Sequence, residues 1–185
     1  MCLFFVTYFI VIAYYILNII EWSEMMVRDI NMSALLSKRP NALAVIKGGR
    51  EYPDIKGGVY FYQTNSGVVV VAKVSGLPYE KEKCKGNIFG FHIHEGEMCS
   101  GTEADEFKNT GMHYNPNGCA HPYHAGDMPP LFGNNGIAIS AFLTNRFTVR
   151  EVLGKSVVIH RNPDDFVSQP SGNAGTKIAC GIIKA

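Results

Sequence analysis

The sequence predicts an all-β domain, an eight-stranded antiparallel barrel or sandwich, preceded by a separate N-terminal apolar helix. Eight short runs of β-branched and aromatic residues recur along the chain, and no convincing helical pattern separates them. Nineteen glycines and nine prolines among 185 residues favour many short elements over a few long helices. Apolar residues make up 46% of the chain, which is enough for a buried core and excludes a disordered chain. The net charge of +1 argues against a nucleic-acid partner bound through bulk charge.

Residues 1–20 form a separate apolar segment, MCLFFVTYFIVIAYYILNII, that contains no charged residue. As a helix they would be about 30 Å long, the thickness of the hydrocarbon core of a bilayer. A membrane anchor is favoured over a cleaved signal peptide, because no Lys or Arg precedes the run and no clear small-x-small cleavage site follows it. The other interpretation is that translation starts at Met25 or Met26 and the segment is not made. We expect a membrane-anchored or exported protein if the segment is made, and a cytoplasmic one otherwise.

Residues 21–41 are predicted to be a linker, in which Met32, Leu35 and Leu36 could form one or two helical turns. Pro40 ends any such helix, because the residue before a proline disfavours the α conformation. The globular domain is therefore expected to span residues 42–185.

The predicted strands begin with residues 42–47 and continue in the order 58–64, 67–74, 88–95, 136–143, 147–149, 156–160 and 177–183. The second and third should form a hairpin, because Asn65-Ser66-Gly67 between them is typical of a tight turn. Residues 96–135 contain no predicted strand, and a loop of that length in a compact domain is usually functional.

The histidines indicate a metal-binding protein. Two of them lie two residues apart in a predicted strand, so both rings project from the same face of the sheet. Two more lie three residues apart in the turn-rich segment HPYHAGD, where a carboxylate follows them. Neutral imidazole suits zinc and copper, and a set of histidines with a carboxylate suits zinc. The candidate ligands are His92, His94, His113, His121, His124, Asp127 and His160.

Five motifs carry a resemblance to a known family. In chain order they are GFHIHE (90–95), GMHYNP (111–116), HAGDMPPL (124–131), GKSVVIH (154–160) with PDD (163–165), and GNAGTKIACGII (172–183). In order and spacing over residues 42–185, the sequence resembles the copper/zinc superoxide dismutases of the bacterial type. The resemblance implies an eight-stranded Greek-key β-barrel with long metal-binding loops, which agrees with the strand pattern.

The resemblance also implies a role for each ligand. Copper would be held by His92, His94, His113 and His160, and zinc by His113, His121, His124 and Asp127. His113 would then bridge the two metals, and Asp164 would hydrogen-bond a copper histidine and a zinc histidine. Cys99 and Cys180 match the disulfide of the family. The implied reaction is the dismutation of superoxide, in which copper changes oxidation state and His113 takes up a proton.

The sequence departs from the family pattern in three ways. His121 and His124 are only three residues apart, and the segment between His160 and Lys177 is short. Lys177 stands where the family usually has Arg, and we expect it to attract the superoxide anion beside copper. Cys119 is a weaker candidate for a zinc ligand, because four other ligands are already available.

Two other functions remain open at this stage. One is a non-enzymatic domain of the same fold that only binds copper or zinc, although relatives of that kind normally lack copper ligands. The other is a purely structural zinc domain, which would leave His92, His94 and His160 unexplained. The enzyme is favoured because the complete set of copper ligands is present.

Overall fold

The computed structural model of the chain describes residues 31–82 and 86–185. The chain divides into two compact units, residues 1–39 and 40–185. In the first unit, the described part contains the short helix α2 (Met32–Leu36), which begins where the side chain of Asn31 accepts a hydrogen bond from the Ala34 amide. The apolar helix predicted over residues 1–20 lies outside the described residues. Within the described ranges, no helix is long and apolar enough to cross a membrane.

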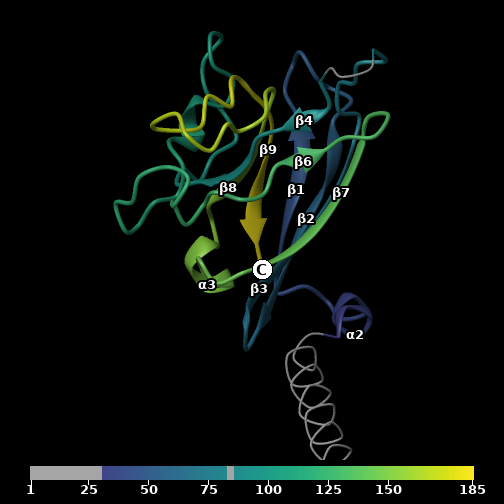
Figure 1. Cartoon of the computed structure of the whole chain (residues 1–185), viewed down its shortest axis with the longest axis vertical. Helices are drawn as coiled ribbons and strands as arrows, with labels where there is room; N and C mark the ends of the chain where they lie inside the picture. Colours follow the sequence, from purple (N-terminus) through teal and green to yellow (C-terminus); the bar gives the residue numbers. More distant parts are fainter. Residues whose placement is uncertain (1–30, 83–85) are drawn as a thin grey trace, which may run out of the picture. The chain divides into compact units, whose positions relative to one another are not determined.

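The second unit is built on a curled, seven-stranded antiparallel sheet with the strand order β5-β8-β9-β1-β2-β3-β7 (Figure 1). A separate two-stranded sheet pairs β4 with β6. The strands are β1 (Ala42–Gly48), β2 (Lys56–Thr64), β3 (Gly67–Ser75), β4 (Ile88–Phe89), β5 (Phe91–His94), β6 (Leu131–Phe132), β7 (Ile137–Thr144), β8 (Ser156–His160) and β9 (Lys177–Lys184). The predicted all-β class is therefore confirmed.

The hydrophobic core lies on one face of this sheet. In β3, residues 68–72 and 74 are buried, and the alternate residues Val68, Val70, Ala72 and Val74 belong to the main core cluster, so this face of the strand packs against the core. The β2–β3 hairpin closes at the predicted turn, where Thr64 pairs with Gly67. Gly67 has a φ of +132°, which explains why a glycine stands at this position.

Two predicted strands differ from the observed ones. The run 88–95 is divided at Gly90 into β4 and β5, which belong to different sheets. The Gly90 amide donates to the Asn162 carbonyl at 2.7 Å, and its own carbonyl accepts from the His160 amide at 2.8 Å. A Cβ at Gly90 would lie 2.8 Å from the Cβ of Ala174, so a side chain would not fit there. Gly90 therefore contacts the neighbouring loop closely instead of continuing a strand.

The strand predicted at residues 147–149 is wrong. Val149 begins the short helix α3 (Val149–Val152). The carboxylate of Glu151 accepts hydrogen bonds from both the amide and the hydroxyl of Thr148, which stabilises the helix start.

The region 96–135 also holds more than was predicted, namely the short helix η1 (Lys108–Thr110) and the strand β6. The described residues thus form nine strands, two of them only two residues long, where eight were expected.

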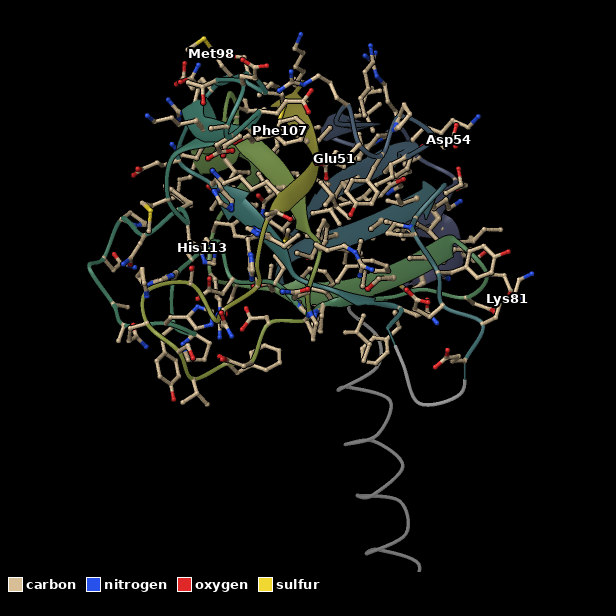
Figure 2. All side chains as sticks on the ribbon, turned by 90° about the horizontal axis from the view of Figure 1, so that it is seen from above. Glu51, Asp54, Lys81, Met98, Phe107 and His113 are labelled. Carbon is tan, nitrogen blue, oxygen red and sulfur yellow. A yellow bond between two sulfur atoms is a disulfide. The ribbon has the colours of Figure 1, made fainter. Side chains whose placement is uncertain are left out.

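Long loops lie beside the β5–β8–β9 side of the sheet and contain most of the predicted ligands. Figure 2 shows His113 among these loops, at the opposite side of the molecule from Lys81. The disulfide between Cys99 and Cys180 joins the loop after β5 to β9, as the family resemblance implied. Together with Phe107 and Val158 it forms a small second cluster of apolar side chains. The loop that carries the site is thereby fixed to the rigid sheet.

Candidate metal centre

Six histidines and one aspartate come together in two overlapping groups. The first histidine group consists of His92, His94, His113 and His160, and the second histidine group of His113, His121, His124 and Asp127. In each group the potential ligand atoms lie within 4.8 Å of one another, and all seven residues are buried. Every ligand predicted from the sequence therefore lies in one of the groups, and His113 lies in both. Cys119 is exposed and belongs to neither.

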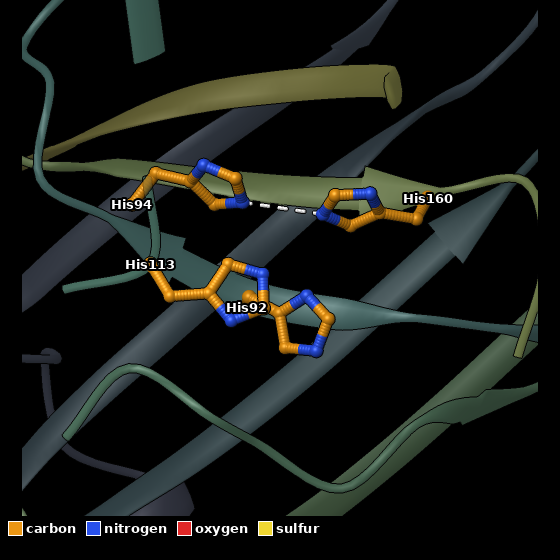
Figure 3. Close-up of side chains that lie close together, drawn as sticks. All are labelled: His92, His94, His113 and His160. Atoms are coloured by element: carbon orange, nitrogen blue, oxygen red, sulfur yellow. Dashed lines mark hydrogen bonds between the residues drawn. The ribbon is translucent and has the colours of Figure 1, made fainter. Parts of the chain in front are cut away.

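Rigid strands position the first group. His92 and His94 project from the same face of β5, and His160 is the last residue of the neighbouring strand β8. The segment that carries His113 pairs with β5 through an isolated bridge to His94. The rings of His113 and His92 lie next to each other, with centroids 3.9 Å apart and planes inclined by 31° (Figure 3). The four rings converge because three of the residues are fixed by backbone pairing within the sheet.

The hydrogen bonds of the first group leave its inner nitrogens without protons. The Nδ1 atoms of His94 and His160 lie 2.9 Å and 3.2 Å from the carbonyls of Gly111 and Gly175. A carbonyl only accepts, so each Nδ1 carries the proton of the neutral ring and each Nε2 presents a lone pair. These two Nε2 atoms face each other at 3.1 Å (Figure 3). Two lone pairs at this distance repel each other unless a proton or a metal ion lies between or beside them.

The other two rings of the first group follow the same rule. His92 donates through Nε2 to Asp164 at 2.7 Å, which leaves its Nδ1 as a lone pair. His113 has Nδ1 2.7 Å from Asp127 Oδ1, which leaves its Nε2 free toward the first group. Both His92 Nδ1 and His113 Nε2 are buried without a hydrogen-bond partner. Unpaired buried acceptors are costly, so this donor set fits a metal ion that prefers imidazole, such as copper.

The second group is formed by one irregular loop around Asp127. The Oδ2 atom of Asp127 lies 3.1 Å from His121 Nδ1 and 3.3 Å from His124 Nδ1, and both nitrogens lack a hydrogen-bond partner. Three imidazole nitrogens and one carboxylate are a typical donor set for zinc. Arg146 holds this loop from the end of β7, since its Nη1 donates to the main-chain carbonyls of Pro122, His124 and Asp127. The sequence analysis did not identify Arg146.

Burial keeps the three strand histidines of the first group neutral. Desolvation lowers the pKa of His92, and it lowers the pKa of His94 even further with the help of the nearby His160. Desolvation and the neighbouring His92 lower the pKa of His160 to about 3. Neutral imidazole is the form that binds a metal, so these rings are ready to coordinate at physiological pH. In the second group, burial alone would raise the pKa of Asp127, but the adjacent histidines lower it below its ordinary value.

Asp164 connects the two groups. One carboxylate oxygen accepts from His92 at 2.7 Å and the other from His121 at 2.9 Å. Burial alone would raise the pKa of Asp164, but hydrogen bonds from His92, the Phe166 amide and His121 hold that pKa well below its ordinary value. Gly172 lies directly beside this contact, since a Cβ there would lie 2.6 Å from His121 Nε2. The arrangement orients one histidine of each group, as the resemblance implied for Asp164.

Lys177, the expected guiding cation, lies at the start of β9 and is 17% exposed. Its Nζ donates to the Phe107 carbonyl at 3.2 Å and lies 3.6 Å from the carboxylate of Asp105. The Lys177 charge is close enough to the first group to contribute to the lowered pKa of His160. It also lines a pocket of about 570 Å³ together with Asp105 and Arg50. In the sequence, Asp105 belongs to an acidic run typical of a solvated loop, and nothing in its spacing connects it with β9.

A curled antiparallel sheet that carries an imidazole-only group and a mixed histidine–carboxylate group, joined through one histidine, defines a two-metal protein of the copper/zinc class. The chain belongs to the copper/zinc superoxide dismutase family, whose family model matches residues 55–183.

Two relatives from Aquifex aeolicus (strain VF5) are similar to the chain. "Superoxide dismutase [Cu-Zn] 2" is 36% identical over 146 residues, which cover 71% of this chain and 80% of the relative. "Superoxide dismutase [Cu-Zn] 1" is 37% identical over 143 residues, with 69% and 79% covered. The similarity therefore extends over most of both proteins.

Proposed function

We propose that the chain is a superoxide dismutase that converts superoxide to dioxygen and hydrogen peroxide, and that residues 42–185 form the catalytic domain. Family membership supports this function. The observation that carries it is the first histidine group, in which four buried imidazoles bring one ring nitrogen each to within 4.8 Å of the others. A structural zinc domain would have no use for the first histidine group.

The two groups divide the metals between them in this proposal. His92, His94 and His160 hold copper alone, His121, His124 and Asp127 hold zinc alone, and His113 faces both. Copper, when bound, supplies the one-electron exchange with superoxide, whereas zinc has no redox chemistry. The chemistry of the donor atoms supports this division, because the carboxylate occurs only in the second group.

His113 is the proton carrier of the proposed mechanism. Its Nε2 faces the first group without a hydrogen-bond partner, while its Nδ1 is directed to Asp127 and the second group. The ring can therefore take up and release a proton at Nε2 while Nδ1 keeps its orientation. Lys177 attracts the superoxide anion by its charge, and the Phe107 carbonyl and Asp105 fix the position of its ammonium group.

Two structural features belong to the same proposal. The first is that the sheet closes into a Greek-key barrel through β4 and β6; the tight turn at Asn134–Ile137, which places β6 next to β7, is compatible with this closure. Residues 1–20 anchor the protein in a membrane or direct its export, and residues 21–41 link them to the catalytic domain. The support for the anchor is the uncharged, apolar composition of the segment.

The metal content of the full chain and of His160→Ala tests the proposal. We expect one copper and one zinc per parent chain, and loss of copper alone in the variant, because His160 belongs only to the first group. Equal loss of both metals would contradict the division of ligands. A parent chain that holds both metals but does not speed superoxide decay would be the non-enzymatic binding domain.

A further inference from the structure

Gln169 makes a two-point contact with the main chain of His121. Its Oε1 accepts from the His121 amide at 3.0 Å, and its Nε2 donates to the His121 carbonyl at 2.7 Å. The two residues are 48 positions apart in the sequence. The side-chain amide thus occupies both main-chain polar groups of a proposed zinc ligand, as a neighbouring strand would do in a sheet.

No regular element provides that support for His121. The residue lies in an irregular loop, in contrast to His92, His94 and His160, which lie in strands. His121 is only 3% exposed, so water cannot readily replace a lost partner of its main chain. Asp164 and Asp127 contact only the ring of His121, whereas Gln169 bonds its main chain.

Gln169 is itself held in a well-bonded turn. The side chain of Asp165 accepts from the amides of Val167 and Ser168 and from the Ser168 hydroxyl. The turn is closed by a hydrogen bond from the Gly172 amide to the Ser168 carbonyl at 2.7 Å. Asp164 and Gln169 therefore reach His121 from one rigid loop, one contacting its ring and the other its main chain.

We propose that Gln169 is a positioning residue for zinc, which fixes the backbone of His121 so that its Nδ1 points into the second histidine group. This inference rests on the proposed function, since it presumes that the second group holds zinc. Gln169 touches no ligand nitrogen, so it acts only through His121.

The test is zinc affinity of the full chain, measured by competition with a chelator, in the parent and in Gln169→Ala. We expect the variant to bind zinc about 10–100-fold more weakly, the range typical of residues that support a metal ligand. Copper affinity should stay unchanged, because no atom of Gln169 contacts a histidine that belongs only to the first group. Gln169→Glu should also weaken zinc binding, since a carboxylate cannot donate to the His121 carbonyl. Cobalt(II) in the zinc site should show an altered absorption spectrum in both variants.

Gln63→Ala is the matched control. Its side-chain amide also bonds only main-chain groups, namely Thr64, Gly67 and Val149, and it lies outside both histidine groups. Unchanged zinc affinity in Gln169→Ala would overturn the inference, as would an equal loss of both metals or the same loss in Gln63→Ala. A parent chain that bound no zinc would instead overturn the proposed function, and the role of Gln169 with it.

Discussion

Asp164 hydrogen-bonds one histidine of each group through a different carboxylate oxygen. We expect Asp164→Asn to weaken zinc binding about 10–100-fold and copper binding less, because His121 lies in a loop and His92 in a strand. An amide can accept through only one of its two terminal atoms, so one histidine loses its partner. Chelator competition with each metal measures the effect. An unchanged zinc affinity would show that Asp164 does not orient His121.

Lys177 and Asp105 form a pair whose charges act in opposite directions on an incoming anion. Lys177→Met should lower the bimolecular rate of superoxide decay and flatten its dependence on ionic strength, because the screening length is about 8 Å at 0.15 M salt. Asp105→Asn should raise the rate, since it removes the negative charge 3.6 Å from the ammonium group. Lys177→Arg should keep the rate or raise it modestly. If Lys177→Met matched the parent at all ionic strengths, Lys177 would have no guiding role.

The residues that the sequence identified and those that it missed differ in a physical respect. Histidine and aspartate side chains can bind metals directly, so His92, His121 and Asp127 could be identified as candidate ligands from residue type and spacing. Arg146 and Gln169 act through hydrogen bonds to main-chain carbonyls and an amide of distant loops. Only the folded chain brings those partners together, and no local pattern predicts them.

At the scale of elements, the error at residues 147–149 has a local cause. The segment Phe147-Thr148-Val149 is short and apolar enough to resemble a strand, yet Thr148 and Glu151 form the signature of a helix start. That signal was present in the sequence. The division of 88–95 at Gly90 could not be predicted in the same way, because it depends on contacts with Asn162 and Ala174.

The start of α3 also gives a pH-dependent prediction. Hydrogen bonds from Thr148 lower the pKa of Glu151 below its ordinary value. A lowered pKa means that this stabilisation is present above the pKa of the unfolded chain and is lost as the pH falls through the folded value. Glu151→Ala should lower the free energy of unfolding by about 0.5–1 kcal/mol at pH 7, and by less at a pH well below the ordinary pKa of a glutamate. Urea unfolding of the metal-free chain measures this, and an effect equally large at both pH values would contradict it.

The disulfide between Cys99 and Cys180 gives a second prediction at the level of elements. It joins positions 81 residues apart, so in the chain-entropy model the bond restricts the unfolded chain strongly. Replacing both cysteines by serine should lower the free energy of unfolding by about 2–5 kcal/mol. Cys119→Ser is the control, because Cys119 is exposed and forms no disulfide bond. Equal stability of the double variant and this control would show that the bond is not structural.

At the scale of the whole molecule, strands and loops have separate tasks. The sheet fixes His92, His94 and His160, while the loops supply the other ligands and are held by the disulfide, Arg146 and Gln169. The sequence predicts the sheet well, because runs of β-branched and aromatic residues between turn signals favour strands locally. It predicts the loop ligands only through motifs, since their positions depend on contacts that are distant in sequence.

The rate of superoxide decay in the presence of the full chain, loaded with copper and zinc, tests the central claim most directly. Stopped-flow absorbance follows the decay, and a chelator removes the contribution of free copper. We expect a rate that rises in proportion to protein concentration, and a rate at the level of the buffer for His160→Ala, which lacks one ligand of the first group. A fully loaded parent chain that left superoxide decay at the level of the buffer would contradict the assignment as a superoxide dismutase.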